Sequence, residues 1–589
     1  MRHFYLFTLI FSSYLQAQLS ISPSAAGDSY LYLNNEVLFV EKEIQLSRNK
    51  KPETKASIYL RNEAQLLQGN KTANLNAGDG FISVFQEGTS NAFDYNYWSL
   101  PVTNNLSVTD KFGENIFEPQ TTTLSTQVKL TSELNGSASP LTISKRWIYK
   151  FSGSGYSSWN YVGDIFDVKP GEGFTMKGVN GINSNTVEGV QNNPGSSQRY
   201  DFRGLPNDGE ISVHINKDEA LLSGNPYPSA LDLKSFLLAN TNTTGIAYYW
   251  DSKENGTSHN LKEYEGGYGA YSPGANVYAP AVFKKYAGDG NEVGNSGNAG
   301  NVYGREFSPI AQGFFLIGIK DGPVTFKNTY RSFQKENNNN SSFRSQVMET
   351  EIPDLSGFRL NVDINDEYTR QLILVFREDS SIGADRAMDA KNFGELKNDA
   401  GWLIEDEHYV INVLPFSAVE MIPLILNFDQ DGSAGFGLEF IRELPGVEIL
   451  LFDSLKNEYF NISGQSMSLE LDKGEYKNRF YLSLKRNLQP QPGLPAKPDK
   501  LTYLPEGSAK INISQNNSFS RLEISLDELS EVELLGLYSL KGQLIYRKKV
   551  DKNEKYLEIP TGNLSNAVYI IKLTEKNGKT YFKKLSVKN

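Results

Sequence analysis

Two carboxylates stand two residues apart in the segment Asp429-Gln430-Asp431-Gly432. Carboxylate oxygens are the hard ligands that Ca²⁺ prefers, and the glycine allows a tight turn in which such ligands converge on one ion. The spacing departs from an EF-hand loop, because the next glutamate is Glu439. We therefore expect calcium, held by Asp429 and Asp431, as the candidate cofactor, with two solvated turn acids as the alternative.

Four tryptophans, Trp98, Trp147, Trp159 and Trp250, lie in a stretch rich in tyrosine and glycine, residues 87–334. A flat aromatic ring that reaches solvent can stack on the face of a sugar, although Trp is equally common in protein cores. Trp98 and Trp250 are the candidate ligand-binding residues, and the ligand class they indicate is an extracellular glycan.

A catalytic constellation is not apparent from the sequence. The three histidines beyond residue 17, His214, His259 and His408, have no second histidine at metal-ligand spacing. The chain has no cysteine, which removes thiol nucleophiles, disulfides and Cys-ligated metals. A glycosidase needs only two carboxylates, so a secreted polysaccharide-degrading protein stays open as the alternative to a non-enzymatic one.

The elements that must position these residues are strands. Short apolar runs such as 30–33, 37–40 and 81–85 are separated by polar or Gly-rich segments, which is typical of β-structure. We expect an all-β chain with several β-sandwich-like domains in tandem and a C-terminal immunoglobulin-like sandwich. For the N-terminal region a short β-helix and half of a sandwich both remain open. The expected divisions are a signal peptide (1–17), an N-terminal β region (18–86), an aromatic and Gly-rich β domain (87–334), a β-sandwich (343–486), a Pro-rich linker (487–500) and a last domain (501–589).

Two segments depart from this pattern. Residues 230–239 carry apolar side chains at helical spacing, and Asp232 would lie in the first turn of a helix starting at Ser229. Residues 287–301 consist mainly of Gly, Asn and acidic side chains that cannot build a core. We expect a mobile loop there.

The N-terminus has the features of a secretory signal. Arg2 and His3 precede an apolar stretch of twelve residues, 4–15, and Leu15-Gln16-Ala17 is a plausible cleavage site. The Sec machinery would then be a partner. We expect no transmembrane anchor, because no later window is long and apolar enough. A net charge of −11 argues against nucleic acid as a partner.

The last domain carries four motifs in a fixed order at the end of the chain. They are residues 537–545 with Tyr538 and Gly542, 559–564, 568–573 with Val568 and Tyr569, and 583–588 with Lys583 and Lys584. This set resembles the type A sorting domain of the type IX secretion system of Bacteroidetes. The resemblance implies that these six residues belong to a sorting signal read by the outer-membrane type IX translocon.

The same resemblance implies a location, in which the cargo passes through the periplasm and ends outside the cell or on its surface, in some cases joined to surface lipopolysaccharide. The body of the chain carries the stretches 97–102 (Tyr-Trp-Ser-Leu-Pro-Val), 224–232 (Gly-Asn-Pro-Tyr-Pro-Ser-Ala-Leu-Asp) and 312–315 (Gln-Gly-Phe-Phe). With these it resembles, more loosely, long flavobacterial surface proteins for which no activity is established. We therefore expect a secreted or cell-surface non-enzymatic protein with a role in adhesion or surface structure.

Overall fold

The computed structural model describes the chain in two units, residues 1–486 and 487–589. The described residues are 19–103, 113–163, 168–253, 256–288, 292–337, 341–343, 356–442, 444, 447–462, 467–486, 502–503, 511–516, 521–526, 532–539, 544–550, 556–561, 564, 567–576 and 580–587. The predicted signal peptide and Pro-rich linker lie outside them. Strands dominate both units, so the all-β prediction is confirmed.

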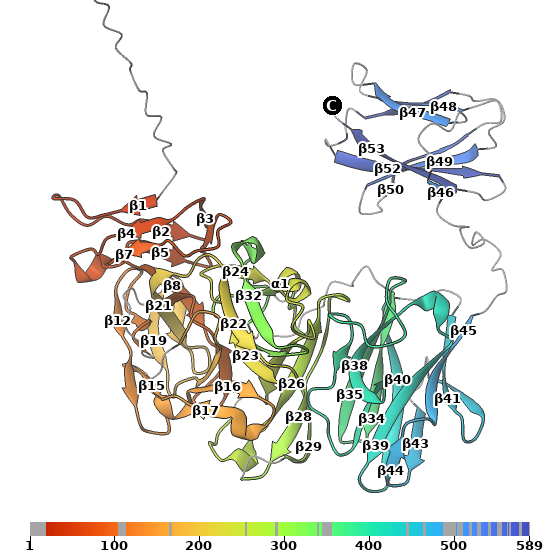
Figure 1. The fold of residues 1–589 in the computed structure, drawn as a ribbon, viewed down its shortest axis with the longest axis horizontal. Coiled ribbons are helices and arrows are strands. Elements are labelled where there is room, and N and C mark those ends of the chain that lie inside the picture. Colours follow the sequence, from red (N-terminus) through yellow and green to blue (C-terminus); the bar gives the residue numbers. More distant parts are fainter. Residues whose placement is uncertain are drawn as a thin grey trace, which may run out of the picture. The chain divides into compact units, whose positions relative to one another are not determined.

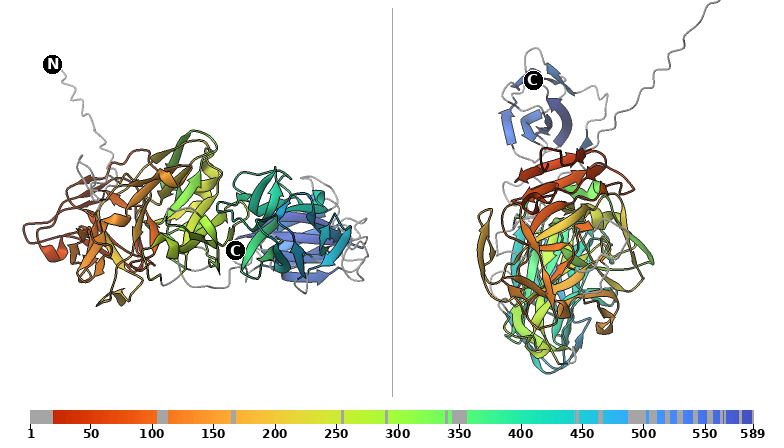
Figure 2. Two further views of the ribbon diagram at one scale, coloured as in Figure 1. Left: turned by 90° about the horizontal axis from the view of Figure 1, so that it is seen from below. Right: turned by 90° about the vertical axis from the view of Figure 1, so that its left-hand side faces the viewer.

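The first unit begins as a short β-helix (Figures 1 and 2). Its successive coils are built from β1 (Leu19–Ile21), β2 (Leu31–Asn34) and β3 (Val37–Val40), then β4 (Ile44–Leu46), β5 (Ile58–Arg61) and β6 (Gln65–Gln68), then β7 (Ala77–Gly78) and β8 (Ile82–Glu87). Each strand pairs in parallel with its counterpart one coil later, as β2 with β5 and β5 with β8. Parallel pairing at this spacing resolves the open alternative in favour of the β-helix.

The β-helix continues into a mixed sheet through β8, which pairs antiparallel with β21. That sheet adds β10 (Val102–Thr103), β11 (Ile116–Pro119), β12 (Ser125–Gln127) and β21 (Arg199–Pro206). Two buried arginines connect strands of the β-helix to neighbouring segments through hydrogen bonds. The Arg61 guanidinium donates to the carbonyl of Ser83 at 3.0 Å, and Arg331 donates to the carbonyl of Leu66 and to Asp208.

A nine-stranded sheet lies beside this region in the first unit. Its strands are β17 (Trp159–Tyr161), β16 (Tyr149–Gly153), β23 (Ala220–Gly224), β31 (Gly313–Ile317), β25 (Ala247–Ser252), β26 (Glu265–Ser272), β28 (Val282–Tyr286) and β29 (Glu292–Ala299), with β27 (Val277–Ala279) paired to β26. The first unit also contains three two-stranded sheets: β9 (Tyr95–Trp98) with β18 (Phe174–Lys177), β19 (Asn183–Val187) with β20 (Val190–Asn193), and β22 (Ile211–Ile215) with β32 (Gly322–Phe326). Two further sheets have three strands each: β13 (Lys129–Thr131), β15 (Leu141–Ser144) and β14 (Ser137–Ala138), and β30 (Phe307–Ser308), β24 (Ala230–Asp232) and β33 (Arg331–Ser332). The first unit also contains the short 3₁₀ turns η1 (Pro52–Thr54), η2 (Lys145–Trp147), η3 (Tyr156–Ser158), η4 (Leu261–Glu263) and η5 (Asn328–Tyr330).

Two expectations need correction here. The helix α1 spans Leu233–Ala239, because residues 230–232 form β24 and Asp232 is the N-cap, accepting a hydrogen bond from the Ser235 amide at 2.8 Å. Part of the segment expected to be a loop, residues 292–299, forms the edge strand β29, which pairs with β28. An edge strand is held by its backbone ladder, so small polar side chains do not prevent it.

The rest of the first unit is one hydrogen-bonded sheet of twelve strands. Along its path run β42 (Glu458–Asn461), β41 (Val447–Asp453), β45 (Phe480–Arg486), β39 (Met421–Phe428), β37 (Asp399–Ile404), β38 (Glu407–Leu414), β35 (Tyr368–Phe376), β34 (Gly357–Ile364), β40 (Gly432–Arg442) and β43 (Met467–Leu471), with β36 (Ala390–Lys391), β44 (Gly474–Tyr476) and the turn η6 (Phe416–Ala418) beside it. Trp402 is fully buried in its centre and donates its indole N–H to the carbonyl of Ile373 at 3.0 Å.

This sheet shares its core with the nine-stranded sheet. One cluster of buried side chains contains Phe315 and Tyr248 together with Leu374 and Trp402. Arg386 reinforces the junction, because its guanidinium donates to the carbonyls of Asn240 at 2.8 Å and Leu238 at 3.1 Å, next to the end of α1. A cation at a helix C-terminus is favourable.

The second unit is a two-sheet sandwich with its own core. One sheet holds β46 (Thr502–Tyr503), β53 (Thr580–Val587), β52 (Ala567–Glu575), β49 (Val532–Ser539) and β50 (Leu544–Lys549), and the other holds β47 (Ile511–Asn516), β48 (Arg521–Leu526) and β51 (Tyr556–Pro560).

Five of the six predicted sorting residues lie on neighbouring strands of the larger sheet. Tyr538 is in β49, Val568 and Tyr569 are in β52, and Lys583 and Lys584 are in β53. Gly542 lies outside the described residues. The strand order β53-β52-β49 therefore brings three motifs that are separate in sequence into one sheet. Their role in sorting stays a prediction.

Candidate functional site

An open pocket of about 420 Å³ is lined by Trp147, Tyr149 and Tyr161 together with Lys145, Arg146 and Ser132. Pockets that hold small ligands generally have volumes of about 300–1,000 Å³ and combine aromatic walls with a few polar groups. We refer to these six residues as the aromatic pocket.

Two of its rings are fixed by a hairpin. Tyr149 in β16 and Tyr161 in β17 are directly paired residues of antiparallel strands, so their side chains share one face of the sheet. Their ring centroids lie 5.4 Å apart at an interplanar angle of 60°. Tyr161 is 56% exposed, so a large part of its ring is available to a ligand.

The third ring, Trp147, ends the turn η2 and is backed on one face. His259 stacks on it with centroids 4.8 Å apart and planes 13° from parallel, and the Lys177 ammonium lies 3.9 Å from its centroid. Lys177 Nζ and His259 Nδ1 are only 3.0 Å apart. Groups on opposite faces of a ring would be about 7 Å apart, so Lys177 and His259 cover the same face. Trp147 itself is half-buried and lines the pocket.

Lys177 is enclosed by aromatic rings. It pairs across the β9–β18 ladder with Tyr95 and lies 4.7 Å from the ring centroids of both Tyr95 and Tyr264. Burial lowers its pKa to about 7, and the charge of Asp94 only partly opposes this. Burial and the neighbouring Lys177 charge also lower the pKa of His259 to about 4. At neutral pH His259 is therefore an uncharged ring that braces Trp147.

Basic groups form the rim of the aromatic pocket. The Nε–H of Arg146 donates to the carbonyl of Ser132, and the Trp147 indole N–H donates to the carbonyl of Leu134 at 2.7 Å. The Arg146 side chain is exposed. In the described part of the chain its two Nη groups donate to no protein atom. They are free to bind a solute.

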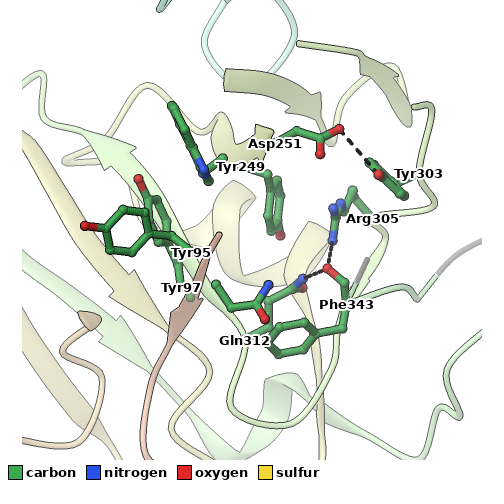
Figure 3. Close-up of a pocket in the computed structure, with 11 residues that line it drawn as sticks. Tyr95, Tyr97, Tyr249, Asp251, Tyr303, Arg305, Gln312 and Phe343 are labelled. Atoms are coloured by element: carbon green, nitrogen blue, oxygen red, sulfur yellow. Dashed lines mark hydrogen bonds between the residues drawn. The ribbon is translucent and has the colours of Figure 1, made fainter. Parts of the chain in front are cut away.

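A second, enclosed cavity lies at the junction of β9, β25 and β31 (Figure 3). Arg305 and Gln312 both donate to the carbonyl of Phe343, at 3.3 and 2.8 Å. Within the described residues, Arg305 Nε, Tyr249 Oη and Trp250 Nε1 have no hydrogen-bond partner. The cavity volume is about 20 Å³. This is room for about one water, which would serve these polar atoms, and it is too small for a sugar ring.

The two tryptophans singled out from the sequence lie away from the aromatic pocket. Trp98 is 1% exposed and packs against Tyr200, Phe202 and Phe343, so it has no free ring face, and its assignment as a stacking residue is wrong. Trp250 is half-buried, contacts Tyr268 and lines the small enclosed cavity.

Asp429 and Asp431 lie exposed in the turn between β39 and β40. One carboxylate oxygen of Asp431 accepts a hydrogen bond from the Lys473 amide at 2.9 Å. Across the described ranges no three His, Cys, Asp or Glu side chains form a group placed to hold a metal ion. Calcium binding here stays a prediction.

Sequence reasoning noted Trp147 without selecting it, and it missed Tyr149, Tyr161, Arg146 and Lys177. Their grouping depends on the β16–β17 hairpin and on the pairing of β9 with β18, which joins residues about 80 positions apart. The available signal was the local run Lys145-Arg146-Trp147 followed by Tyr149.

Comparison with known proteins places both units. A family model described as a domain of unknown function, DUF8693, matches residues 10–484, and a secretion system C-terminal sorting domain matches residues 510–588. No curated protein is similar enough to count as a match. No helix in the described parts of the chain could cross a membrane.

Two solved structures show faint similarity. One is described as a biofilm associated protein, BSP domain, with 8% identity over 86% of this chain and 96% of that chain and a TM-score of 0.12. The other is E. coli alpha-2-macroglobulin in its native conformation, with 6% identity over 85% of this chain and 33% of that chain and a TM-score of 0.12. At these TM-scores neither carries an argument. The family matches do: the chain belongs to the DUF8693 family and is type IX secretion cargo, exported to the cell surface or the extracellular space by a C-terminal sorting domain.

Proposed function

We propose that this exported protein acts in adhesion at the cell surface, binding glycans through the aromatic pocket without transforming them. The observation that carries the proposal is the exposed pocket itself. The pocket presents the exposed ring of Tyr161 next to Trp147, with Arg146 at its rim. The rings match the flat apolar faces of a sugar, and the basic side chain matches its polar edges.

The rival function is degradation of a polysaccharide. A glycosidase needs two facing carboxylates beside the bound sugar. Among the residues that the structure describes, the six that line the aromatic pocket include neither Asp nor Glu. This composition favours retention of a glycan over its cleavage. A role as a surface structural component that also holds surface lipopolysaccharide is compatible with the same pocket.

A binding and turnover assay on one preparation tests the proposal. The secreted protein is applied to a glycan array and to glycan-coated beads, and released reducing ends are measured in parallel. We expect retention without release of reducing ends, and loss of retention when Tyr149 and Tyr161 are both replaced by Ala. Steady release of reducing ends, or retention that the double substitution leaves unchanged, would contradict it.

A further inference from the structure

The aromatic pocket places aromatic rings next to the guanidinium group of Arg146. This combination indicates which chemical class of saccharide the pocket can bind. Guanidinium groups bind carboxylates and sulfates through paired, charge-assisted hydrogen bonds. Arg146 is held by Ser132 through Nε and keeps both Nη groups free of described protein partners. It can therefore offer a fork at a fixed place beside Trp147.

We infer that the aromatic pocket selects saccharides that carry an anionic group, a carboxylate or a sulfate ester. The inference rests on the proposed function and adds the ligand class to it. The pyranose ring would lie against the exposed ring of Tyr161, beside Trp147, with its anionic substituent on Arg146. Lys145, the residue before Arg146, also lines the pocket.

The overall charge of the protein does not prevent this. The chain carries a net charge of −11, which would repel an anionic polymer at long range. Exposed charges are largely screened beyond about 8 Å at physiological ionic strength. An anionic group bound on Arg146 is therefore affected mainly by that guanidinium and only weakly by charges farther away. Glu133 follows Ser132 in the chain but does not line the pocket.

The experiment compares three probes on the full chain by calorimetric titration: oligogalacturonate, which is carboxylated, a sulfated dextran oligomer, and a neutral maltooligosaccharide. The variants are Arg146→Gln, which removes the fork, and Tyr161→Ala, which removes an exposed ring outside the core. Lys320→Gln is the matched control, because it removes one positive charge from an exposed side chain outside the pocket.

We expect at least one anionic probe to bind more tightly than the neutral one, and which of them does so identifies the carboxylate or the sulfate as the recognised group. Arg146→Gln should weaken its binding about tenfold, Tyr161→Ala should weaken all sugar binding, and Lys320→Gln should change neither. Equal binding of the neutral probe, with Arg146→Gln unchanged, would overturn the inference and leave the proposed function standing. Failure of all three probes and of the glycan array would overturn both.

Discussion

Lys177 offers the sharpest test of the physical picture behind the aromatic pocket. Its side chain is buried, 3% exposed, against Tyr95, Trp147 and Tyr264. We expect Lys177→Met to stabilise the first unit at low pH, because methionine fills a similar volume without bringing a charge into the protein.

The magnitude follows from the pKa. Burial lowers the pKa of Lys177 from 10.5 to about 7. At 1.36 kcal/mol for each pKa unit, the ammonium destabilises the folded state by about 5 kcal/mol when it is fully charged. Below pH 7 the folded and unfolded states are both protonated, so this effect is fully present. Between pH 7 and 10.5 only the unfolded state binds the proton, so the stability of the wild type rises with pH. From pH 6 to 9.5 the gain is about 3 kcal/mol.

The assay is urea unfolding followed by tryptophan fluorescence at several pH values. All five tryptophans lie before residue 487, so the signal reports the first unit alone. The free energies of unfolding of Lys177→Met and of the wild type should converge as pH rises toward 10.5. Lys320→Met, an exposed substitution, should follow the wild type at every pH. Parallel profiles for Lys177→Met and wild type would refute the reasoning. They would mean that the attraction of the ammonium to three ring faces, together with its hydrogen bonds to Tyr264 Oη and His259 Nδ1, offsets its burial.

Three further outcomes are expected. Asp399→Asn should destabilise the first unit by about 3–5 kcal/mol in the same urea assay, because it leaves the buried Arg370 without the carboxylate that now accepts two hydrogen bonds at 2.7 Å; a change below 1 kcal/mol would contradict this. If calcium binds the turn, Ca²⁺ should raise the melting temperature of the wild type but not of a variant with Asp429→Asn and Asp431→Asn, and equal responses would reject the site. Deleting residues from Leu501 onward should leave the protein in the periplasm, as measured by cell fractionation, and undiminished secretion would contradict the sorting role.

The fold was predictable where the signal is local. The apolar runs that form strands, and the ordered motifs of the last domain, each consist of consecutive residues. The all-β class and the sorting domain can therefore be predicted from the sequence. The β-helix was left open, because its parallel pairs join residues such as Leu31 and Ile58, and no short window reports that pairing. β29 was missed because its composition, mostly Gly, Asn and other polar residues, conceals a strand that is held by its backbone hydrogen bonds.

The candidate site was harder to predict from the sequence than the fold. Trp98 and Trp147 are the same residue type in the same aromatic-rich region, yet one is in the core and the other borders the aromatic pocket. The difference is created by partners far away in sequence: Trp98 meets Tyr200 and Phe343, while Trp147 meets His259. Burial of a single aromatic ring is a tertiary property, so residue type alone could not separate them.

The junction around Arg386 has a consequence for how this protein survives outside the cell. Chain cleavage between residues 344 and 355 would cut the connection between the nine-stranded and the twelve-stranded sheets, but it would leave their common core and the Arg386 hydrogen bonds in place. The two fragments would stay bound to each other without any covalent link, in a chain that has no cysteine to provide one. An extracellular protease that cut the chain there would therefore leave the aromatic pocket attached to the rest of the first unit.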